Sequence, residues 1–392
     1  MKRFLLLTVA SMMLLELSAQ QIKHPKAYDK AHFEEFQRIL DNPTTKKNTK
    51  YVFTEAHELG LLGKMFYDTP NPYARIDVTK YPGMTKSENY QARCSAGLTV
   101  MFKTNSSTIS VTTEFGQRYS SVATMPMAYL GYDLYIKNAK GEWQYASSKA
   151  AKEKDIKKNL VIIKNMAPGE KECLLYLPIY TEILSCKIGV EEGAYLEKLE
   201  SPFRHKIVFH GSSYTHGIST SRAGMSYPMQ FMRHTGLQVL GFGMSGNCKM
   251  QPYFADVLAD VEADAYIFDP FSNGNYKSIR ARLVPFIDRL VAAHPGKPLI
   301  FQQTIHREGR YFCMTNDAAE QAKKDMASTI FANEILGKPQ YKDVYFILTD
   351  ATDGDSHEYS VDGTHPDDHG YCMWARSIEK TVLKILAKYG IK

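Results

Sequence analysis

A short apolar run that ends in two serines is the first of four segments that could perform chemistry. Residues 207–209 are apolar, Gly211 interrupts the run, and Ser212 and Ser213 follow. A buried strand that ends in this way places a small nucleophile at the rim of a sheet. The simpler interpretation is a strand-to-helix turn in which the serines cap the next helix. The chemical interpretation therefore depends on what the other segments carry.

Two further segments could supply the donors that acyl transfer requires. Such a reaction needs a hydroxyl nucleophile, an imidazole base, an acid that fixes the imidazole tautomer, and donors for the developing oxyanion. GFGMSGN (241–247) offers the backbone N–H of Gly246, and FDPFSNGN (268–275) offers the side-chain amide of Asn273, with Asn275 as an alternative. A turn glycine and a strand-end cap are the simpler explanations of these residues.

The fourth segment, DGTHP, carries Asp362 and His365 three residues apart. In a tight turn the carboxylate of Asp362 can accept the Nδ1–H of His365, which leaves Nε2 free to face a serine. The proline that follows suits the first turn of a final helix. We expect Ser213 to be the nucleophile, His365 the base and Asp362 the orienting acid, with Ser212 as the less favoured nucleophile.

The oxyanion donors that we expect are the N–H groups of Ser213 and Gly246 and the amide of Asn273. Five other residues are weaker candidates for lining a substrate pocket, and ordinary loop polarity explains them equally well. They are Tyr214, His216, Arg222, His306 and Arg307.

HPDDH spaces His365 and His369 as metal ligands on a helix, but the glutamate of HExxH and a third ligand are missing. We expect no metal and no cofactor.

Strand–helix alternation dominates residues 202–392. Near-continuous apolar runs alternate with amphipathic stretches, which is typical of a parallel sheet covered on both faces. The predicted strands lie within 206–210, 236–242, 264–271, 297–304 and 343–350, and a last helix covers about 366–389. We expect a five-stranded, doubly wound α/β domain, in which ligands bind beyond the carboxyl ends of the strands.

Residues 51–201 have a different pattern. Stretches such as 98–115 and 127–147 alternate apolar and polar residues, are rich in β-branched and aromatic types, and are separated by turn residues. Short strands of this kind predict an antiparallel β-sandwich. The polar residues 21–50 read as an extension that contains one short helix at 33–40.

The first twenty residues have the pattern of a secretory signal peptide. A basic start, an apolar centre and a small-residue end at Ser18 and Ala19 follow one another. The alternative is a single membrane anchor, but Glu16 interrupts an apolar run that is already short for a span of ~20 residues. We expect an exported protein, periplasmic or extracellular, without a membrane span.

Composition narrows the classes of function. The 392 residues are 44% apolar and 23% charged with a formal net charge of +6, and no dense block of Lys and Arg occurs. A nucleic-acid partner is therefore not suggested.

Of the six cysteines, Cys173 and Cys186 could bridge neighbouring strands, which export would permit. Isolated buried thiols are at least as good an explanation.

Taken in order, the four segments resemble the blocks of the SGNH/GDSL hydrolase superfamily. GSS (211–213) is similar to the Gly-Asp-Ser block, with Ser213 in the serine place and Ser212 where many members have aspartate. MSGN, PFSNGN and DGTH match the other blocks. GYDLYIKNAKGEW (131–143) resembles the Gly-x-Asp-Leu-Tyr β-domain that precedes certain SGNH domains, so the resemblance covers most of residues 51–392.

The resemblance implies a flavodoxin-like SGNH domain after a β-sandwich, as in two-domain carbohydrate esterases. It therefore implies a secreted serine esterase that removes O-acetyl or other acyl groups from carbohydrate, although the substrate rests on fold-level analogy. Its partners would be an acylated carbohydrate or another small ester. Two alternatives stay open: a glycan-binding protein with an idle SGNH domain, and a lipase or thioesterase that uses the same triad.

Overall fold

The computed structural model describes residues 26–349 and 357–392. It separates into two compact units, one up to Lys46 and one from Lys47 to Lys392. The predicted signal peptide, residues 1–20, lies outside the described residues. None of the helices within the described ranges has the length and apolar character needed to cross a membrane.

The first unit contains one described helix, α2 (Lys30–Asp41). Its N-cap is Asp29, whose side chain accepts the backbone N–H of His32 at 2.9 Å, so one of the unpaired donors at the helix start is satisfied. Two of its apolar residues, Phe33 and Leu40, are exposed. The prediction of a short helix in this extension is confirmed.

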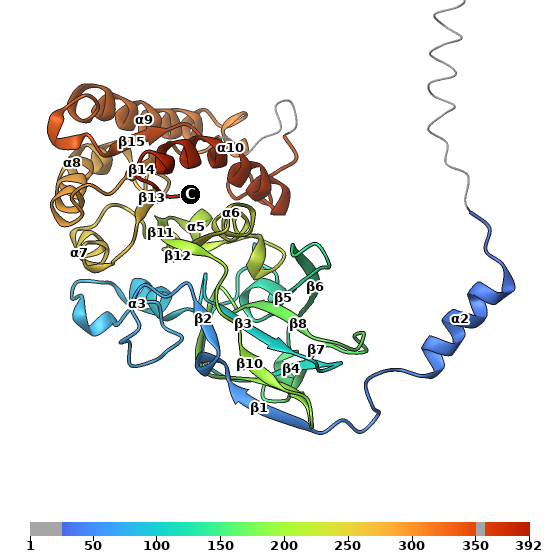
Figure 1. The fold of residues 1–392 in the computed structure, drawn as a ribbon. Helices are drawn as coiled ribbons and strands as arrows, with labels where there is room; N and C mark the ends of the chain where they lie inside the picture. Colours follow the sequence, from blue (N-terminus) through green and yellow to red (C-terminus); the bar gives the residue numbers. More distant parts are fainter. Residues whose placement is uncertain (1–25, 350–356) are drawn as a thin grey trace, which may run out of the picture. The chain divides into compact units, whose positions relative to one another are not determined.

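Two antiparallel sheets form the first part of the second unit (Figure 1). One sheet has the order β1 (Tyr51–Glu55), β9 (Thr181–Glu191), β4 (Ile109–Arg118), β7 (Leu160–Ile163). The other has the order β10 (Leu196–Lys198), β3 (Thr99–Thr104), β8 (Lys171–Tyr176), β5 (Tyr132–Lys137), β6 (Trp143–Lys149), with β2 (Gly60–Leu62) also paired to β3.

Alternate residues of the two sheets share one core. Val100 and Phe102 of β3 and Leu175 of β8 pack in the same buried cluster as Val111 of β4 and Ile188 of β9. Period-two burial of this kind is what the alternating sequence predicts. The prediction of an antiparallel β-sandwich is confirmed. Two short helices that the sequence did not suggest, α3 (Lys86–Arg93) and α4 (Pro126–Tyr129), lie in its connections.

The second part of this unit contains a five-stranded sheet in which every neighbouring pair is parallel. Its order is β12 (Leu237–Gly243), β11 (Arg204–Gly211), β13 (Ala265–Asp269), β14 (Leu299–Gln302), β15 (Val344–Ile347). The first strand in sequence therefore lies between the second and the third, which is the flavodoxin-like order. The prediction of a doubly wound α/β domain is confirmed.

Helices cover both faces of this sheet (Figure 1). They are α5 (Ser213–His216), α6 (Tyr227–Thr235), α7 (Pro252–Asp260), α8 (Tyr276–Ala293), α9 (Met314–Ile330) and α10 (Asp368–Ala387). Ile207 of β11 packs in one core with Phe231 of α6 and Trp374 of α10. Val208, the next residue, packs in another core with Phe254 of α7. Burial on both faces explains why these strands are apolar without alternation.

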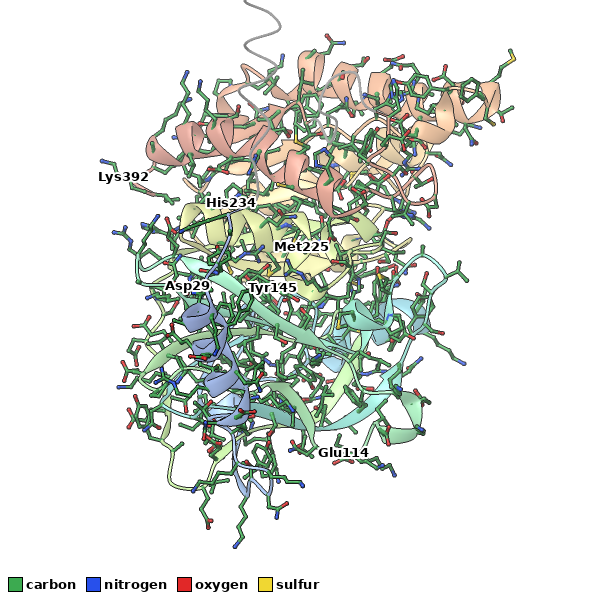
Figure 2. The ribbon with its side chains drawn as sticks, turned by 90° about the vertical axis from the view of Figure 1, so that its right-hand side faces the viewer. Asp29, Glu114, Tyr145, Met225, His234 and Lys392 are labelled. Atoms are coloured by element: carbon green, nitrogen blue, oxygen red, sulfur yellow. The ribbon has the colours of Figure 1, made fainter. Side chains whose placement is uncertain are left out.

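The two parts of this unit meet at the Gly-x-Asp-Leu-Tyr sequence. Asp133, fully buried on β5, accepts from the guanidinium of Arg222 at 2.8 Å and from the backbone N–H of Gly224 at 2.9 Å. The Arg222 guanidinium also lies 4.2 Å from the ring centre of Tyr145. Figure 2 labels Tyr145 of β6 and Met225, which lies in the segment before α6. The motif therefore joins the β-sandwich to the loop that precedes α6.

All six cysteine thiols are free. Cys173 and Cys186 are both buried, and each lies in the apolar core of the sandwich. The disulfide that the sequence permitted between them is not formed, and the alternative of isolated buried thiols describes the structure.

Candidate active site

The turn after β11 divides two roles between its two serines. Ser212 is the N-cap of α5, and its Oγ accepts the backbone N–H of Tyr214 at 3.2 Å. Ser213 is the first helical residue and is 5% exposed. Only glycine fits before them, because a Cβ on Gly211 would lie 2.1 Å from the hydroxyl of Thr215. The cap that the simpler sequence interpretation expected is therefore Ser212, and Ser213 is left for other contacts.

Ser213, His365 and Asp362 form one hydrogen-bonded chain. The Oγ of Ser213 lies 3.1 Å from Nε2 of His365, although the two residues are 152 positions apart. Nδ1 of His365 lies 2.8 Å from Oδ2 of Asp362. Because a carboxylate only accepts, Nδ1 carries the proton and Nε2 is the acceptor for the serine hydroxyl. This is the connectivity that a serine nucleophile and its base require.

A tight turn fixes the carboxylate. Oδ1 of Asp362 accepts the backbone N–H of Thr364 at 3.0 Å and of His365 at 2.8 Å. Burial acts to raise the pKa of Asp362, but the hydrogen bonds and charge of His365, with the N–H of Thr364, outweigh burial and hold the pKa below its usual value. The Asp362 side chain is 38% exposed, so water also reaches it.

The loop after β12 brings Gly246 to the same sheet edge. The backbone N–H of Met244 donates to the carbonyl of Gly211 at 2.8 Å, which joins this loop to the serine turn. Gly246 has φ +70°, a left-handed conformation that glycine adopts without strain. It is exposed, and a Cβ on it would meet no atom within 4 Å. No acceptor for its N–H occurs among the residues that the structure describes.

Asn273 follows β13, and the loop of Gly246 orients its amide. The backbone N–H of Cys248 donates to Oδ1 of Asn273 at 3.2 Å. Because Oδ1 is the acceptor in this bond, the NH₂ group of Asn273 is left as a donor. Asn275, the alternative candidate, instead caps α8 by accepting the N–H of Ser278 at 2.9 Å. The structure therefore gives the two asparagines different contacts.

The β-sandwich part contacts the Gly246 loop directly. The fully buried guanidinium of Arg75 donates to the carbonyl of Gly243 at 3.0 Å, and Gln91 of α3 donates to the carbonyl of Ser245 at 2.9 Å. The hydroxyl of Tyr180 is hydrogen bonded to the hydroxyl of Ser245. The sequence did not single out these residues, and nothing in their local pattern distinguishes them from ordinary loop polarity.

A second carboxylate, Asp269, lies beneath the serine turn. It is 1% exposed, and its Oδ2 accepts the hydroxyl of Ser212 at 2.7 Å and the backbone N–H of the same residue at 3.2 Å. The hydroxyls of Thr215 and Ser272 donate to it at 3.3 and 3.2 Å. Burial raises the pKa of Asp269 to about 6, although these hydrogen bonds act in the opposite direction. Its position at the end of a predicted strand was the one available signal.

Four of the five weaker candidates separate into two groups. Tyr214 directly follows Ser213 and contacts Thr364, the residue before His365. Arg307 contacts Tyr214 and Ser272, the residue before Asn273. His216 and Arg222 face the β-sandwich part instead. Nε2 of His216 lies 2.8 Å from the carbonyl of Ile179, and its ring stacks on Tyr180 at 4.1 Å. Burial holds the pKa of His216 well below its usual value.

His306, the remaining weak candidate, lies in the segment after β14. Its ring centre is 4.7 Å from that of Tyr311. Burial lowers the pKa of His306.

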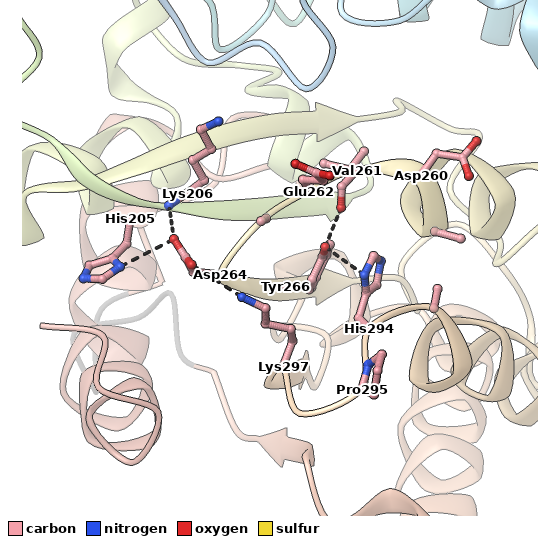
Figure 3. Close-up of a pocket in the computed structure, with 13 residues that line it drawn as sticks. His205, Lys206, Asp260, Val261, Glu262, Asp264, Tyr266, His294, Pro295 and Lys297 are labelled. Carbon is pink, nitrogen blue, oxygen red and sulfur yellow. Dashed lines mark hydrogen bonds and ion pairs between the residues drawn. The ribbon is translucent and has the colours of Figure 1, made fainter.

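A cavity of about 790 Å³ lies at the other edge of the same sheet (Figure 3). His205 and Lys206 at the start of β11 line it, with Tyr266 at the start of β13 and His294 at the end of α8. In this cavity Asp264 lies 3.5 Å from both His205 and Lys297. None of the four segments that carry the candidate catalytic residues reaches it.

Two family models match the chain. Residues 204–384 match the GDSL-like lipase/acylhydrolase family, and residues 49–196 match the GxDLY domain, the N-terminus of SGNH-hydrolase-type esterases. No curated protein matches the chain.

Several solved structures are similar. A Bacteroides ovatus protein described as a GDSL-like lipase is 37% identical with a TM-score of 0.82, and the match covers 86% of this chain and 98% of that one. The salicylyl-acyltransferase SsfX3 from a tetracycline biosynthetic pathway is 18% identical with a TM-score of 0.64, covering 87% and 99%. A family two carbohydrate esterase from Clostridium thermocellum, in complex with cellohexaose, is 13% identical with a TM-score of 0.53, covering 74% and 93%.

The last two structures share only the fold, but the identity and coverage of the first establish the family. The predicted resemblance is confirmed: the chain belongs to the GDSL-like lipase/acylhydrolase family and is an SGNH-type esterase with an N-terminal GxDLY domain.

Proposed function

We propose that the chain is an exported serine esterase that removes O-acyl groups, above all O-acetyl groups, from carbohydrate. One observation carries the catalytic assignment: the continuous chain from Ser213 Oγ through His365 to Asp362, at 3.1 and 2.8 Å. The carbohydrate substrate is supported by the shared fold of the family two carbohydrate esterases and by the GxDLY domain. Export is supported by the pattern of residues 1–20.

In the proposed reaction, the Oγ of Ser213 attacks the ester carbonyl while Nε2 of His365 takes the hydroxyl proton. The carbonyl π-electrons move onto oxygen and give a tetrahedral oxyanion. When it collapses, the bond between the acyl carbon and the sugar oxygen breaks, His365 gives the proton to that oxygen, and an acyl-Ser213 intermediate remains. His365 then deprotonates a water molecule, which attacks this ester; when the second tetrahedral oxyanion collapses, the acid leaves and His365 returns the proton to the Oγ of Ser213. Asp362 stays ionised and stabilises the imidazolium in both steps.

The oxyanion donors in this proposal are the N–H groups of Ser213 and Gly246 and the NH₂ of Asn273. Their availability supports the assignment: Gly246 is exposed, and the Cys248 N–H occupies the carbonyl side of the Asn273 amide. Donors that are held in place before the reaction need no reorganisation when charge develops, which is the largest single source of catalysis in many acyl transfers.

The catalytic assignment is tested by hydrolysis of nitrophenyl acetate with Ser213→Ala and, as the matched control, Ser212→Ala. We expect kcat to fall by on the order of 10⁶ in Ser213→Ala, because the nucleophile is removed. Ser212→Ala should keep the nucleophile and lose much less activity. Full activity in Ser213→Ala, or a reversed order of the two variants, would falsify the assignment. Failure of the folded wild type to react with a fluorophosphonate probe would indicate an idle domain.

The substrate is tested separately by acetate release from a panel of acetylated glycans and by a chain-length series of nitrophenyl esters. A carbohydrate esterase should release acetate from at least one glycan and prefer the shortest esters. A preference for long acyl chains without release from any glycan would favour a lipase instead.

A further inference from the structure

Arg307, in the segment that follows β14, connects parts of the site that are remote in sequence. Its Nε donates to the hydroxyl of Tyr214 at 2.8 Å, and its Nη2 donates to the carbonyl of Ser272 at 2.8 Å. Nη1 donates to the carboxylate of Glu320 at 3.0 Å. The side chain is 16% exposed. Each of its three nitrogens therefore has an acceptor inside the protein, which leaves the group poorly placed to bind substrate.

The contact between Arg307 and Tyr214 links Arg307 to the chain neighbours of both Ser213 and His365. Tyr214 directly follows Ser213, and its hydroxyl lies 2.9 Å from the carbonyl of Thr364, which directly precedes His365. Arginine has no acceptor, so the tyrosine hydroxyl must accept from Arg307 and donate its single proton to Thr364. The direction of both hydrogen bonds is thereby fixed. Tyr214 is fully buried, so bulk solvent does not reach its hydroxyl.

The second contact runs to the proposed oxyanion donor Asn273. Ser272 directly precedes it, and the Ser272 carbonyl accepts from both Arg307 and Lys323, the latter at 3.1 Å. Glu320 pairs with both cations, at 3.0 and 2.5 Å. Two cationic donors on one carbonyl fix the peptide that carries Asn273.

We propose that Arg307 is a positioning residue: one guanidinium sets the mutual positions of Ser213, His365 and Asn273 through their chain neighbours. This inference rests on the proposed function. The three blocks lie on separate strand exits, and acyl transfer requires them to agree within about 0.5 Å. A planar guanidinium can serve this purpose because its donors point in fixed, divergent directions, whereas an ammonium group is a single point donor.

The test compares Arg307→Lys with Arg310→Lys. Arg310 lies in the same segment and is also buried, but its guanidinium donates to Asp317 at 2.7 Å and to Gln321 at 2.9 Å, both on α9. For Arg307→Lys we expect kcat for nitrophenyl acetate to fall by about 10²-fold, since small displacements of catalytic groups have effects of this size. KM should change little, and labelling of Ser213 by a fluorophosphonate should slow by a similar factor. Arg310→Lys should keep the wild-type kcat and labelling rate.

Tyr214→Phe provides a second variant that removes only the bridging hydroxyl. It should slow labelling less than Arg307→Lys, because the Ser272 branch stays intact. The double variant should lose less than the product of the two single effects, since both act through the same hydrogen bonds. If Arg307→Lys does not fold, the comparison of Tyr214→Phe with wild type decides the question.

Three results would overturn the proposal. One is a wild-type kcat and labelling rate in folded Arg307→Lys, or in Tyr214→Phe when that variant decides. Another is that the Arg307 and Arg310 variants lose the same amount of kcat and the same amount of melting temperature, which would indicate a purely structural role. The third is independent effects of Arg307 and Tyr214 in the double variant. Failure of the proposed function has a different signature, in which Ser213→Ala labels and hydrolyses like the wild type.

Discussion

Two carboxylates flank the serine turn, and their surroundings differ in almost every respect. Asp362 is 38% exposed and pairs with an imidazole within its own four-residue turn. Asp269 is 1% exposed, and its side-chain partners among the described residues are hydroxyls and one backbone N–H. The pKa of Asp362 lies below its usual value, whereas burial raises the pKa of Asp269 to about 6.

The difference assigns different tasks to the same functional group. In the proposed reaction the carboxylate beside the imidazolium must stay ionised throughout, and partial exposure with a histidine partner favours the ionised form of Asp362. Asp269 forms no ion pair with any residue that the structure describes, and it joins Ser212 and Thr215 after β11 to Ser272 after β13. We infer that Asp269 sets the geometry of two strand exits, while Asp362 acts on the base.

Replacing the exposed carboxylate should have the largest effect on the reaction. In Asp362→Asn we expect kcat for nitrophenyl acetate to fall by about 10⁴, because the amide can present its NH₂ to Nδ1 and favour the wrong imidazole tautomer. Folding should be little affected. Steady-state kinetics with a thermal melt would measure both quantities.

Asp367→Asn is the matched control for this change. Asp367 lies in the same segment, but it caps α10 by accepting the N–H of Gly370 at 2.9 Å. Asparagine is an equally good cap, so both activity and stability should stay near the wild type. Equal kcat values for the two variants would show that Asp362 does not orient the base.

The two carboxylates also differ in how far the sequence predicts them. The local spacing of Asp362 and His365 predicts that they pair, because a turn of four residues suffices to join them, and the two side chains lie within hydrogen-bond distance. Asp269 was read as part of a strand end, since its partner Ser212 is 57 positions away and only the pairing of β11 with β13 brings them together. Charged residues whose burial depends on tertiary contacts, such as Arg75 and Glu320, carry no such local signal.

The elements of the fold also divide into those that the sequence predicts and those that it does not. The five parallel strands were predicted because burial on both faces leaves near-continuous apolar runs. Helix α3 was not predicted, because it lies between irregular segments and its start depends on a capping box of Thr85 and Glu88. No local pattern predicts that Gln91 of α3 contacts the loop of Gly246, because the two are joined only by tertiary structure.

The opposite pKa shifts predict opposite effects of pH on stability. The folded protein holds a proton on Asp269 up to about pH 6, whereas the unfolded chain loses it near pH 3.8. The stability that this proton contributes is therefore complete below about pH 4 and is lost as the pH rises through 6, by about 3 kcal/mol. Asp362 acts in the other direction, because its contribution is present above its unfolded pKa and is lost in acid.

Asp269→Asn isolates this effect, because asparagine does not titrate. Between pH 4 and pH 7 the free energy of unfolding of the variant should increase relative to that of the wild type by about 2–3 kcal/mol, because only the wild type loses the stability that the Asp269 proton contributes. Urea unfolding at the two pH values measures the change, and the other carboxylates cancel in the difference. A difference that is the same at both pH values would contradict the raised pKa.

The smallest effect concerns one hydrogen bond to the buried carboxylate. Ser272→Ala removes a hydroxyl that donates to Oδ1 of Asp269 at 3.2 Å. At pH 7 the acceptor is charged, so we expect a loss of about 1.5–3 kcal/mol in the free energy of unfolding, and a smaller loss at pH 4, where Asp269 is neutral.

Ser360→Ala is the control in the exposed turn, because its hydroxyl donates to the backbone carbonyl of His365 at 3.2 Å and its loss should not depend on the ionisation of Asp269. A cost for Ser272→Ala that is equal at both pH values would mean that Asp269 does not change its charge in this range. The distinction between an exposed carboxylate that stays ionised and a buried one that titrates would then have to rest on Asp362 alone.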